Sequence, residues 1–301
     1  MHTNELVSII IPTHKGVETI GRAIDSVLSQ SYSNIEILVV DDNGLGTPEQ
    51  IETQKIVDSY LNPKIRYLCH KMNKNGSAAR NTGIKHARGL FIALLDDDDI
   101  FYREKIATQI NCLKTCSDEE IGVCYVGYET IFPNGTKMQM PANIEGKLTY
   151  AILRGDAHMP SSSILFKKTV WENVGGFDES FQRHQDWEFL VRLSSMYSIK
   201  AINEILMTRI ILKRNSPNSA AKFETQRLYY LKKMENYILS LPSDKSEEVY
   251  LKHFSDIAKE FFKEGNILKG LKYIFKTKKT IKAFVHLTRN FVKHSKYRKF
   301  S

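Results

Sequence analysis

The chain has 301 residues, of which 42% are hydrophobic and 26% charged, with a formal net charge of +9 at pH 7. This composition is that of an ordinary globular protein and excludes a disordered or collagen-like chain. We expect neither a signal peptide nor a spanning helix, because no apolar run approaches the roughly 18 residues needed, and the four cysteines are spaced neither for structural zinc nor for a disulfide framework. A cytoplasmic protein with reduced thiols is therefore expected.

The first segments of the chain predict a strand, a helix and a second strand. Residues 7–11 form a β-branched apolar run ended by Pro12, which suits a buried strand. Apolar residues recur at helical spacing from Ile20 to Leu28, and a second apolar run covers 35–40. Because such a βαβ unit joins parallel strands, we expect an α/β fold with a mostly parallel central sheet.

Two acidic segments follow strands of this predicted sheet. Further strands are predicted over 65–70 and 90–95, with a helix over 77–86 between them. The strand over 90–95 runs into four aspartates, Asp96 to Asp99, and the second strand ends at Asp41 and Asp42. Since ligands bind outside the carboxyl ends of parallel strands, we expect both acidic segments to line one crevice.

The remainder of the chain changes character along its length. Strand-like runs at 122–132 and 162–166 precede a helical pattern at 187–196, and helical periodicity dominates from about Phe223. Pro and Ser cluster near 215–220. We therefore predict an α/β domain over residues 1–215 and a helical, strongly basic extension over residues 216–301.

The four aspartates suggest a site for a hard cation. In an extended segment alternate side chains share a face, so Asp96 and Asp98 are expected on one side and Asp97 and Asp99 on the other. Two carboxylates suit Mg²⁺ or Mn²⁺, ions that complete their shells with water and substrate phosphates. On spacing alone, a solvated acidic turn is an equal alternative.

Four segments in this order resemble the family 2 glycosyltransferases, which are inverting enzymes with the GT-A fold and nucleotide-sugar donors. The segments are VSIIIPTHKG at 7–16, VVDDNG at 39–44, GSAARNTGIKHARG at 76–89 leading into FIALLDDDDIF, and GGFDESFQRHQDWEFLVRL at 175–193. The resemblance covers about the first 215 residues. It implies a GT-A fold, Rossmann-like in its sheet, followed by a C-terminal helical extension.

The resemblance also implies residues that bind the nucleotide. Thr13 and Asp42 would hold the nucleobase and ribose, with Asp41 as a neighbour that could take the place of Asp42. Arg80 would contact the base or the phosphates, and its planar guanidinium suits both. A local ion pair of a surface arginine is the alternative reading of Arg80.

The resemblance places the metal and the base as well. Asp96 would contact the ribose and Asp98 the metal, with Asp99 in support, whereas Asp97 occupies the variable position of the family pattern and is left out. The base that accepts the proton of the acceptor hydroxyl would be Asp186.

The region of the predicted base departs from the family pattern. Gln185 replaces the usual glutamate before Asp186, which removes a negative charge and should lower the pKa of the base slightly. Glu188 is the alternative base, and a helix N-terminal carboxylate without a catalytic role is the structural alternative for Asp186. Lys213 and Arg214 stand where many relatives carry a histidine that helps at the metal.

The C-terminal segment is strongly basic. From Gly265 to Ser301 it contains eleven Lys or Arg and no Asp or Glu, with apolar residues at helical spacing. This pattern is typical of a helix that binds an anionic membrane surface. A helical hairpin packed on the catalytic domain explains the same pattern equally well. No nucleic-acid-binding motif accompanies the charge, so we expect no nucleic acid partner.

Together these patterns predict a metal-dependent, inverting glycosyltransferase with Mn²⁺ or Mg²⁺ as cofactor, peripheral at the inner face of the cell membrane. It would move a hexose or N-acetylhexosamine from a UDP-sugar to a hydroxyl of a glycan or lipid-linked glycan acceptor in surface polysaccharide biosynthesis. A nucleotidyltransferase acting on sugar phosphates is a rival, although IPTHKG is a poor nucleotide loop. A catalytically inactive GT-A module that binds lipid or glycan is another.

Overall fold

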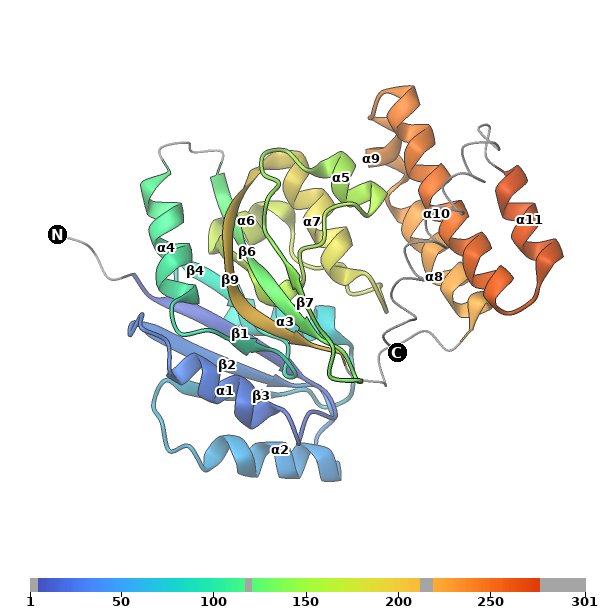
Figure 1. The fold of residues 1–301 in the computed structure, drawn as a ribbon. Coiled ribbons are helices and arrows are strands. Elements are labelled where there is room, and N and C mark those ends of the chain that lie inside the picture. Colours follow the sequence, from blue (N-terminus) through green and yellow to red (C-terminus); the bar gives the residue numbers. More distant parts are fainter. Residues whose placement is uncertain (1–4, 117–120, 212–218, 277–301) are drawn as a thin grey trace. The chain divides into compact units, whose positions relative to one another are not determined.

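The computed structural model describes residues 5–116, 121–211 and 219–276, which form two compact units (Figure 1). The first unit comprises Met1–Phe132, Lys137–Leu148 and Met159–Ile211. The second comprises Pro133–Thr136, Thr149–His158 and Leu212–Ser301. The division between Ile211 and Leu212 lies a few residues before the boundary that we predicted at 215. The sequence did not predict the two internal segments of the second unit, 133–136 and 149–158.

The first half of unit one is an α/β arrangement of parallel strands. β1 (Val7–Thr13), β2 (Ile35–Asp41), β3 (Ile65–Cys69) and β4 (Phe91–Leu94) lie in the order β3-β2-β1-β4, all parallel. The helices between them are α1 (Ile20–Leu28), α2 (Pro48–Asp58) and α3 (Gly76–His86). The predicted βαβ unit and parallel sheet are confirmed, and α2 is an element that we did not predict.

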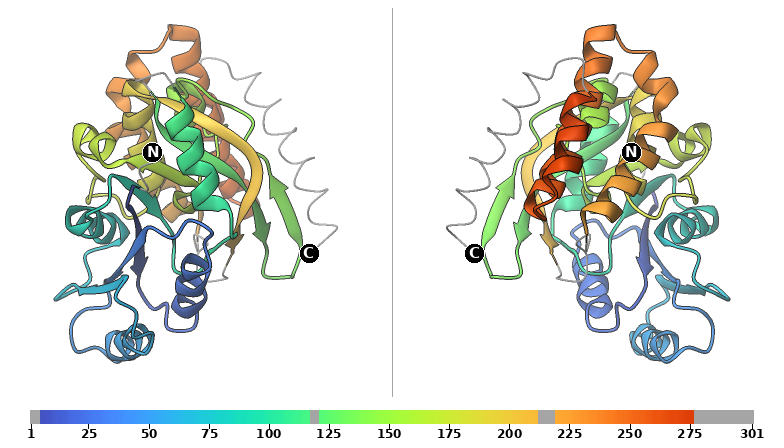
Figure 2. Two further views of the ribbon diagram at one scale, coloured as in Figure 1. Left: turned by 90° about the vertical axis from the view of Figure 1, so that its left-hand side faces the viewer. Right: turned by 90° about the vertical axis from the view of Figure 1, so that its right-hand side faces the viewer.

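The second half of unit one extends this sheet with mixed pairings. β8 (Ile164–Lys167) is antiparallel to both β4 and β6 (Ile121–Ile131), while β9 (Ser198–Ile210) is parallel to β6. β5 (Ile100–Phe101) pairs with β9, and β7 (Lys137–Met140) pairs with β6. The helices of this half are α4 (Lys105–Thr115), α6 (Lys168–Val174) and α7 (Gln185–Met196). Figure 2 shows β6 and β9 running side by side along the curved part of the sheet.

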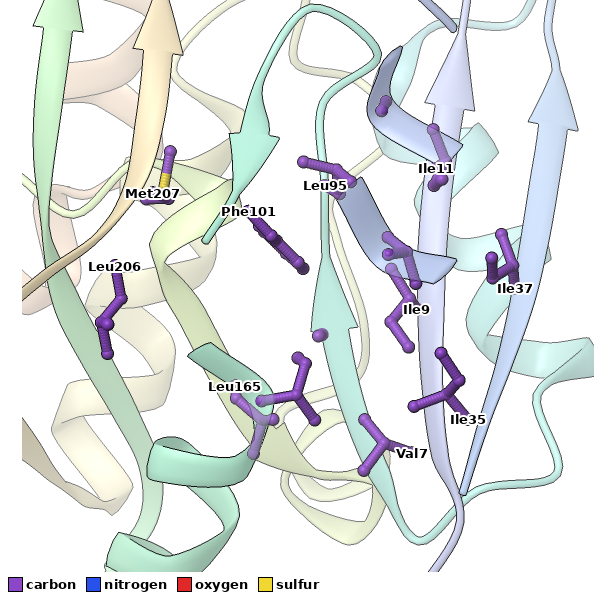
Figure 3. Packing of buried hydrophobic residues seen from close by; sticks show 14 of the residues in the cluster. Val7, Ile9, Ile11, Ile35, Ile37, Leu95, Phe101, Leu165, Leu206 and Met207 are labelled. Atoms are coloured by element: carbon purple, nitrogen blue, oxygen red, sulfur yellow. The ribbon is translucent and has the colours of Figure 1, made fainter. Parts of the chain in front are cut away.

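Helices cover both faces of this sheet, which explains why its central strands are continuous apolar runs. On one face Val7, Ile9 and Ile11 pack with Ile35 and Ile37, as Figure 3 shows, and α1 and α4 belong to the same buried cluster. On the other face α3 approaches so closely that a Cβ on Gly83 would lie 2.3 Å from Ile10 Cγ2. The two layers fix the strand ends that carry the acidic segments.

The described part of unit two consists mainly of helices. It contains α5 (Thr149–Arg154), α8 (Ala220–Lys233), α9 (Glu235–Leu239), α10 (Ser243–Lys263) and α11 (Ile267–Phe275). α11 packs on α10, where a Cβ on Gly270 would lie 2.3 Å from Phe262 Cε1. One face of α11 is therefore buried, whereas Leu268 and Phe275 on another face are 83% and 67% exposed.

The membrane-related expectations are tested in part. Across the ranges that the structure describes, no helix is long and apolar enough to cross a membrane. The part of the basic segment beyond Lys276 lies outside the described residues.

Candidate active site

The four aspartates after β4 form a tight turn, which corrects our expectation of an extended segment. The N–H of Asp99 donates to the carbonyl oxygen of Asp96 at 3.0 Å, which is the hydrogen bond of a four-residue β-turn. Asp97 and Asp99 are nevertheless buried, while Asp96 and Asp98 are partly exposed. Exposure therefore alternates along the four aspartates, although they do not form the extended segment that we expected.

Asp97, which we left out of the predicted site, is bonded to a predicted nucleotide-binding residue. Thr13 Oγ1 donates to Asp97 Oδ2 at 2.6 Å, and both side chains are buried. Gly16 completes this contact, because a Cβ there would lie only 1.9 Å from Asp97 Oδ2. The end of β1 and the aspartate turn are therefore joined by a direct hydrogen bond.

Asp99 anchors the turn to two other parts of the sheet. Its carboxylate accepts from Ser162 Oγ at 2.6 Å and from the N–H of Ile210 at 3.1 Å. Burial raises the pKa of Asp99 well above its ordinary range, and the charge of Asp96 adds to this effect. Ser162 Oγ also accepts from the N–H of Asp96 at 3.0 Å, so one serine holds both ends of the turn.

Asp42 holds the loop that leads into α3. Its carboxylate accepts from the backbone N–H groups of Lys74 and Asn75, each at 2.8 Å, and its Oδ1 lies 2.7 Å from His70 Nδ1. Its own N–H donates to the carbonyl oxygen of Thr13 at 2.9 Å. The second acidic strand end therefore meets the end of β1.

Asp41, the neighbour of Asp42, has partners of its own. It is fully buried and accepts from Tyr67 Oη at 2.7 Å and from the N–H of Asn43 at 2.8 Å. Burial and the bonded carboxylate together raise the pKa of Tyr67. These contacts give Asp41 a structural role inside β2 and β3.

Arg80 connects the aspartate turn to the start of α7. Its Nη2 donates to Asp96 Oδ1 at 2.6 Å, and its Nη1 donates to Gln185 Oε1 at 3.0 Å. The guanidinium also lies over the ring of Phe177, 5.8 Å from its centroid. The ion pair that we considered as an alternative is therefore present, and Gln185, the departure from the family pattern, serves as its second acceptor.

Asp186 lies in the first turn of α7, beside this network. Its Oδ1 accepts from the N–H of Trp187 at 3.0 Å. Part of the side chain remains accessible, yet the surrounding protein atoms raise its pKa by desolvation, while the charges of Arg80 and Arg209 lower it. A carboxylate with a raised pKa is a better proton acceptor near neutral pH, which is the property of a general base.

Glu188, the alternative base, is committed to an ion pair. Its side chain is only 3% exposed, and both of its oxygens bond Arg192, with Nη2 to Oε2 at 2.7 Å. Arg192 further donates to the carbonyl oxygens of Val174 and Gly176 at 2.5 and 2.6 Å. This pair stabilises the turn before α7, where Gly175 and Gly176 both have positive φ.

Two carboxylates of the aspartate turn could serve as metal ligands together with water and substrate oxygens. Among the described residues, no group of three His, Cys, Asp or Glu side chains could hold a metal ion by itself. The two partly exposed carboxylates, Asp96 and Asp98, nevertheless fit Mg²⁺ or Mn²⁺, which commonly take one or two carboxylates plus water and phosphate oxygens. Lys213 and Arg214 lie outside the described residues, so their predicted role stays a prediction.

The comparisons with known proteins agree with this fold. Residues 8–206 match the family described as "Glycosyl transferase family 2". An uncharacterized glycosyltransferase of Rickettsia felis is 34% identical over 209 residues, which are 67% of this chain and 33% of that protein. The chain spans about a third of the length of the first curated relatives that it matches.

A named relative covers a similar region. The UDP-Glc:alpha-D-GlcNAc-diphosphoundecaprenol beta-1,3-glucosyltransferase of Escherichia coli is 31% identical over 198 residues, which are 66% of this chain and 73% of that enzyme. The chondroitin synthase of Pasteurella multocida is 27% identical over 232 residues, which are 75% of this chain and 22% of that protein.

Solved structures share the fold at low identity. The mannosyltransferase of Pyrobaculum calidifontis, in complex with GDP-Man and Mn²⁺, has a TM-score of 0.61 and 13% identity, and the match covers 98% of this chain and 82% of that one. S. aureus TarS in complex with UDP has a TM-score of 0.54 and 15% identity, with 89% of each chain covered. These similarities confirm the predicted GT-A fold. Because the family match extends over most of the chain and includes every predicted site residue up to Glu188, this protein belongs to glycosyl transferase family 2.

Proposed function

We propose that this chain transfers a hexose or N-acetylhexosamine from a UDP-sugar to a hydroxyl of a glycan, with inversion at the anomeric carbon. The arrangement of Arg80 carries the proposal, since one guanidinium joins Asp96 of the aspartate turn to Gln185, the residue before Asp186. These contacts link the proposed donor site to the start of α7, where the proposed base lies. The name of the related E. coli enzyme, which specifies UDP-Glc and a lipid diphosphate acceptor, supports the same chemistry.

In this proposal the nucleotide lies across the carboxyl ends of β1, β2 and β4. Thr13 and Asp42 would define the pocket for base and ribose, and Asp96 would bind the ribose. Thr13 is hydrogen-bonded to Asp97, and Asp42 to the loop before α3, so the positions of both side chains are fixed by protein contacts. Such preorganised polar groups lower the entropic cost of binding.

The metal would be held by Asp98, with Asp96 beside it and Asp99 in support. Mn²⁺ or Mg²⁺, when bound, supplies positive charge that stabilises the leaving diphosphate. The protein's contribution is to hold the carboxylates in the turn, through the Ser162 contacts to Asp96 and Asp99.

Asp186 would accept the proton of the acceptor hydroxyl. The hydroxyl oxygen then attacks the anomeric carbon from the face opposite the diphosphate, and the bond from that carbon to the diphosphate oxygen breaks, which inverts the configuration. Glu188 is a poorer candidate for this step, because both of its oxygens bond Arg192.

The exposed face of α11 is proposed to contact an anionic membrane surface. Ile267, Leu268 and Phe275 are at least 60% exposed, and Lys272 is exposed beside them. Apolar side chains flanked by lysines suit the boundary between acidic headgroups and acyl chains. This would keep the enzyme peripheral at the inner face of the membrane, next to a lipid-linked acceptor.

A transfer assay with purified full-length protein tests the proposed reaction. Mn²⁺, a panel of UDP-hexoses and UDP-N-acetylhexosamines, and lipid-linked glycan acceptors are incubated together, and the anomeric configuration of the product is read by NMR. We expect an inverted product and loss of transfer in Asp186→Asn. A retained configuration would contradict the mechanism, and biological function unimpaired by Asp186→Asn would favour the inactive binding module.

A vesicle-binding assay tests the membrane contact separately. The double variant Leu268→Glu/Phe275→Glu should lose binding to vesicles of phosphatidylglycerol, whereas Leu61→Glu, a change at a 92% exposed leucine of the other unit, should not. Wild-type binding should weaken with salt. Equal binding of the double variant and the wild type would contradict this contact.

A further inference from the structure

Asn75 has a backbone conformation that is unusual for a residue with a side chain. Its φ is 110° and its ψ is 169°, a region that glycine alone normally occupies, because a Cβ is crowded there. The other described non-glycine residues with positive φ, Lys15, Leu61 and His184, have φ of 58°, 45° and 61°, near the ordinary left-handed helical region. Since such strain persists only where the surroundings fix a residue, the contacts of Asn75 indicate its role.

Asn75 bonds two separate parts of unit one through different atoms. Its backbone N–H donates to Oδ2 of Asp42, a residue of the proposed nucleobase pocket, at 2.8 Å. Its side-chain Nδ2 donates to the carbonyl oxygen of Glu179 at 2.7 Å, while its Oδ1 accepts from the N–H of Ala78 and so caps α3. Backbone and side chain are therefore both committed, which explains why the strained conformation is kept.

Glu179 lies in the segment between the glycine turn and α7, whose first turn carries Asp186. A second residue of α3 holds the same segment. Asn81, which is 6% exposed, donates through Nδ2 to the carbonyl oxygen of Phe177 and to Glu179 Oε1, each at 2.9 Å, and its Oδ1 accepts from the N–H of Phe177 at 2.9 Å. The segment before the proposed base is therefore attached to α3 at two points, and Asn75 is the one that also bonds the nucleobase pocket.

We propose that Asn75 is a positioning residue that couples the nucleobase pocket at Asp42 to the segment that carries the proposed base, Asp186. The inference rests on the proposed function and adds a residue that acts through these two. A nucleotide bound beside Asp42 holds that carboxylate, Asp42 holds the backbone of Asn75, and the amide of Asn75 holds the carbonyl group of Glu179. Because the rate of transfer depends steeply on the placement of the base, the coupling should appear in kcat rather than in UDP affinity.

Asn75→Gly tests the coupling, because it removes the side-chain bond to Glu179 and little else. Glycine adopts this φ and ψ without crowding, its N–H can still donate to Asp42, and glycine at an N-cap costs little stability relative to asparagine. We therefore expect an unfolding midpoint at or above that of the wild type and an unchanged UDP affinity in Mn²⁺, with kcat about tenfold lower. Leu61→Gly is the matched control, since Leu61 also has a positive φ and is 92% exposed, and its kcat should not change.

Hydrogen exchange of the full chain measures the coupling without a transfer assay. UDP with Mn²⁺ should slow the exchange of backbone amides in 177–186 about threefold or more in the wild type and in Leu61→Gly, because local opening of this segment is suppressed. Asn75→Gly should lose most of this protection. Peptides that contain Asp42 should be protected by UDP in all three proteins, which confirms that each binds the nucleotide.

The outcomes separate this inference from the proposed function. If Asn75→Gly transfers sugar at the wild-type rate, or keeps the full protection of 177–186, the coupling is refuted while the donor assignment stands. A lower kcat together with a lower unfolding midpoint would give Asn75 a role in stability only, and would also refute the coupling. If the wild type binds no UDP in Mn²⁺, the proposed function fails, and the inference fails with it.

Discussion

Asp186 and Glu188 are only two residues apart, but replacing each by its amide should change a different property. Glu188→Gln should lower the stability of the protein, and Asp186→Asn should lower the rate of transfer. Glu188 and Arg192 form an ion pair with side chains 3% and 18% exposed. Glu188→Gln leaves a mostly buried guanidinium without its counter-charge, and breaking such a pair typically costs about 3 kcal/mol or more. For a unit of roughly 200 residues, this corresponds to a fall of about 6–12 °C in the unfolding midpoint.

Asp186→Asn should not destabilise the protein. Burial raises the pKa of Asp186, so the folded state already disfavours the charged form, and a neutral amide removes that cost. Transfer, however, should fall by roughly 10²–10⁴, the usual contribution of a general base. The amide cannot accept the hydroxyl proton.

Thermal unfolding by circular dichroism and initial transfer rates distinguish the two carboxylates. We expect a stable but inactive Asp186→Asn and a destabilised Glu188→Gln. A Glu188→Gln variant that is as stable as the wild type and inactive, together with an active Asp186→Asn, would show that the base has been assigned to the wrong residue.

Three further predictions follow from particular contacts. Gly16→Ala should weaken UDP binding, measured by calorimetry, because its Cβ would lie 1.9 Å from Asp97 Oδ2. Gly21→Ala should leave UDP binding unchanged, because its Cβ would lie 3.6 Å from Tyr60 Oη, an ordinary contact distance. The acid limb of kcat/KM should lie above the ordinary aspartate pKa of 3.8, since Asp186 must be deprotonated and its pKa is raised; a limb at or below 3.8 would contradict this. Burial lowers the pKa of His253 from 6.5 to about 3, so the unfolded state binds more protons than the folded state between these pH values. The free energy of unfolding should therefore be about 2 kcal/mol smaller at pH 5 than at pH 7.5, and His253→Gln should abolish this dependence on pH.

The parallel half of the sheet was predictable because its strands are buried on both faces. Such strands are continuous apolar runs, and the predicted runs at 7–11 and 35–40 coincide with β1 and β2. β9 was missed, since SIKAINEILMTRI has neither strict alternation nor a continuous apolar run, and its pairing with β6 contains register shifts. Only the neighbouring strands make this segment a strand.

Local motifs predicted the candidate site residues, but they did not predict the long-range contacts of these residues. Asp97 gave no signal, because its partner Thr13 is 84 residues away and the variable position of a motif suggests no role. The four aspartates were expected in an extended segment, yet they form a turn.

The assignment of the base also depends on packing that the sequence alone does not show. Asp186 and Glu188 both follow the G-G-F-D segment and occupy the first turn of α7. Residues two apart on a helix project in nearly opposite directions, so only the packing decides which one faces the aspartate turn. Arg192, four residues after Glu188, is the partner that reveals its structural role.

In the proposed function, the aspartate turn binds a divalent cation together with a UDP-sugar donor. Calorimetric titration of the purified protein with UDP, with and without Mn²⁺ and with GDP and CDP as controls, tests it most directly, and Asp98→Ala serves as the matched variant. We predict UDP-selective binding that requires Mn²⁺ and is lost in Asp98→Ala. Equal UDP affinity with and without Mn²⁺, or no binding of any nucleotide, would contradict the account.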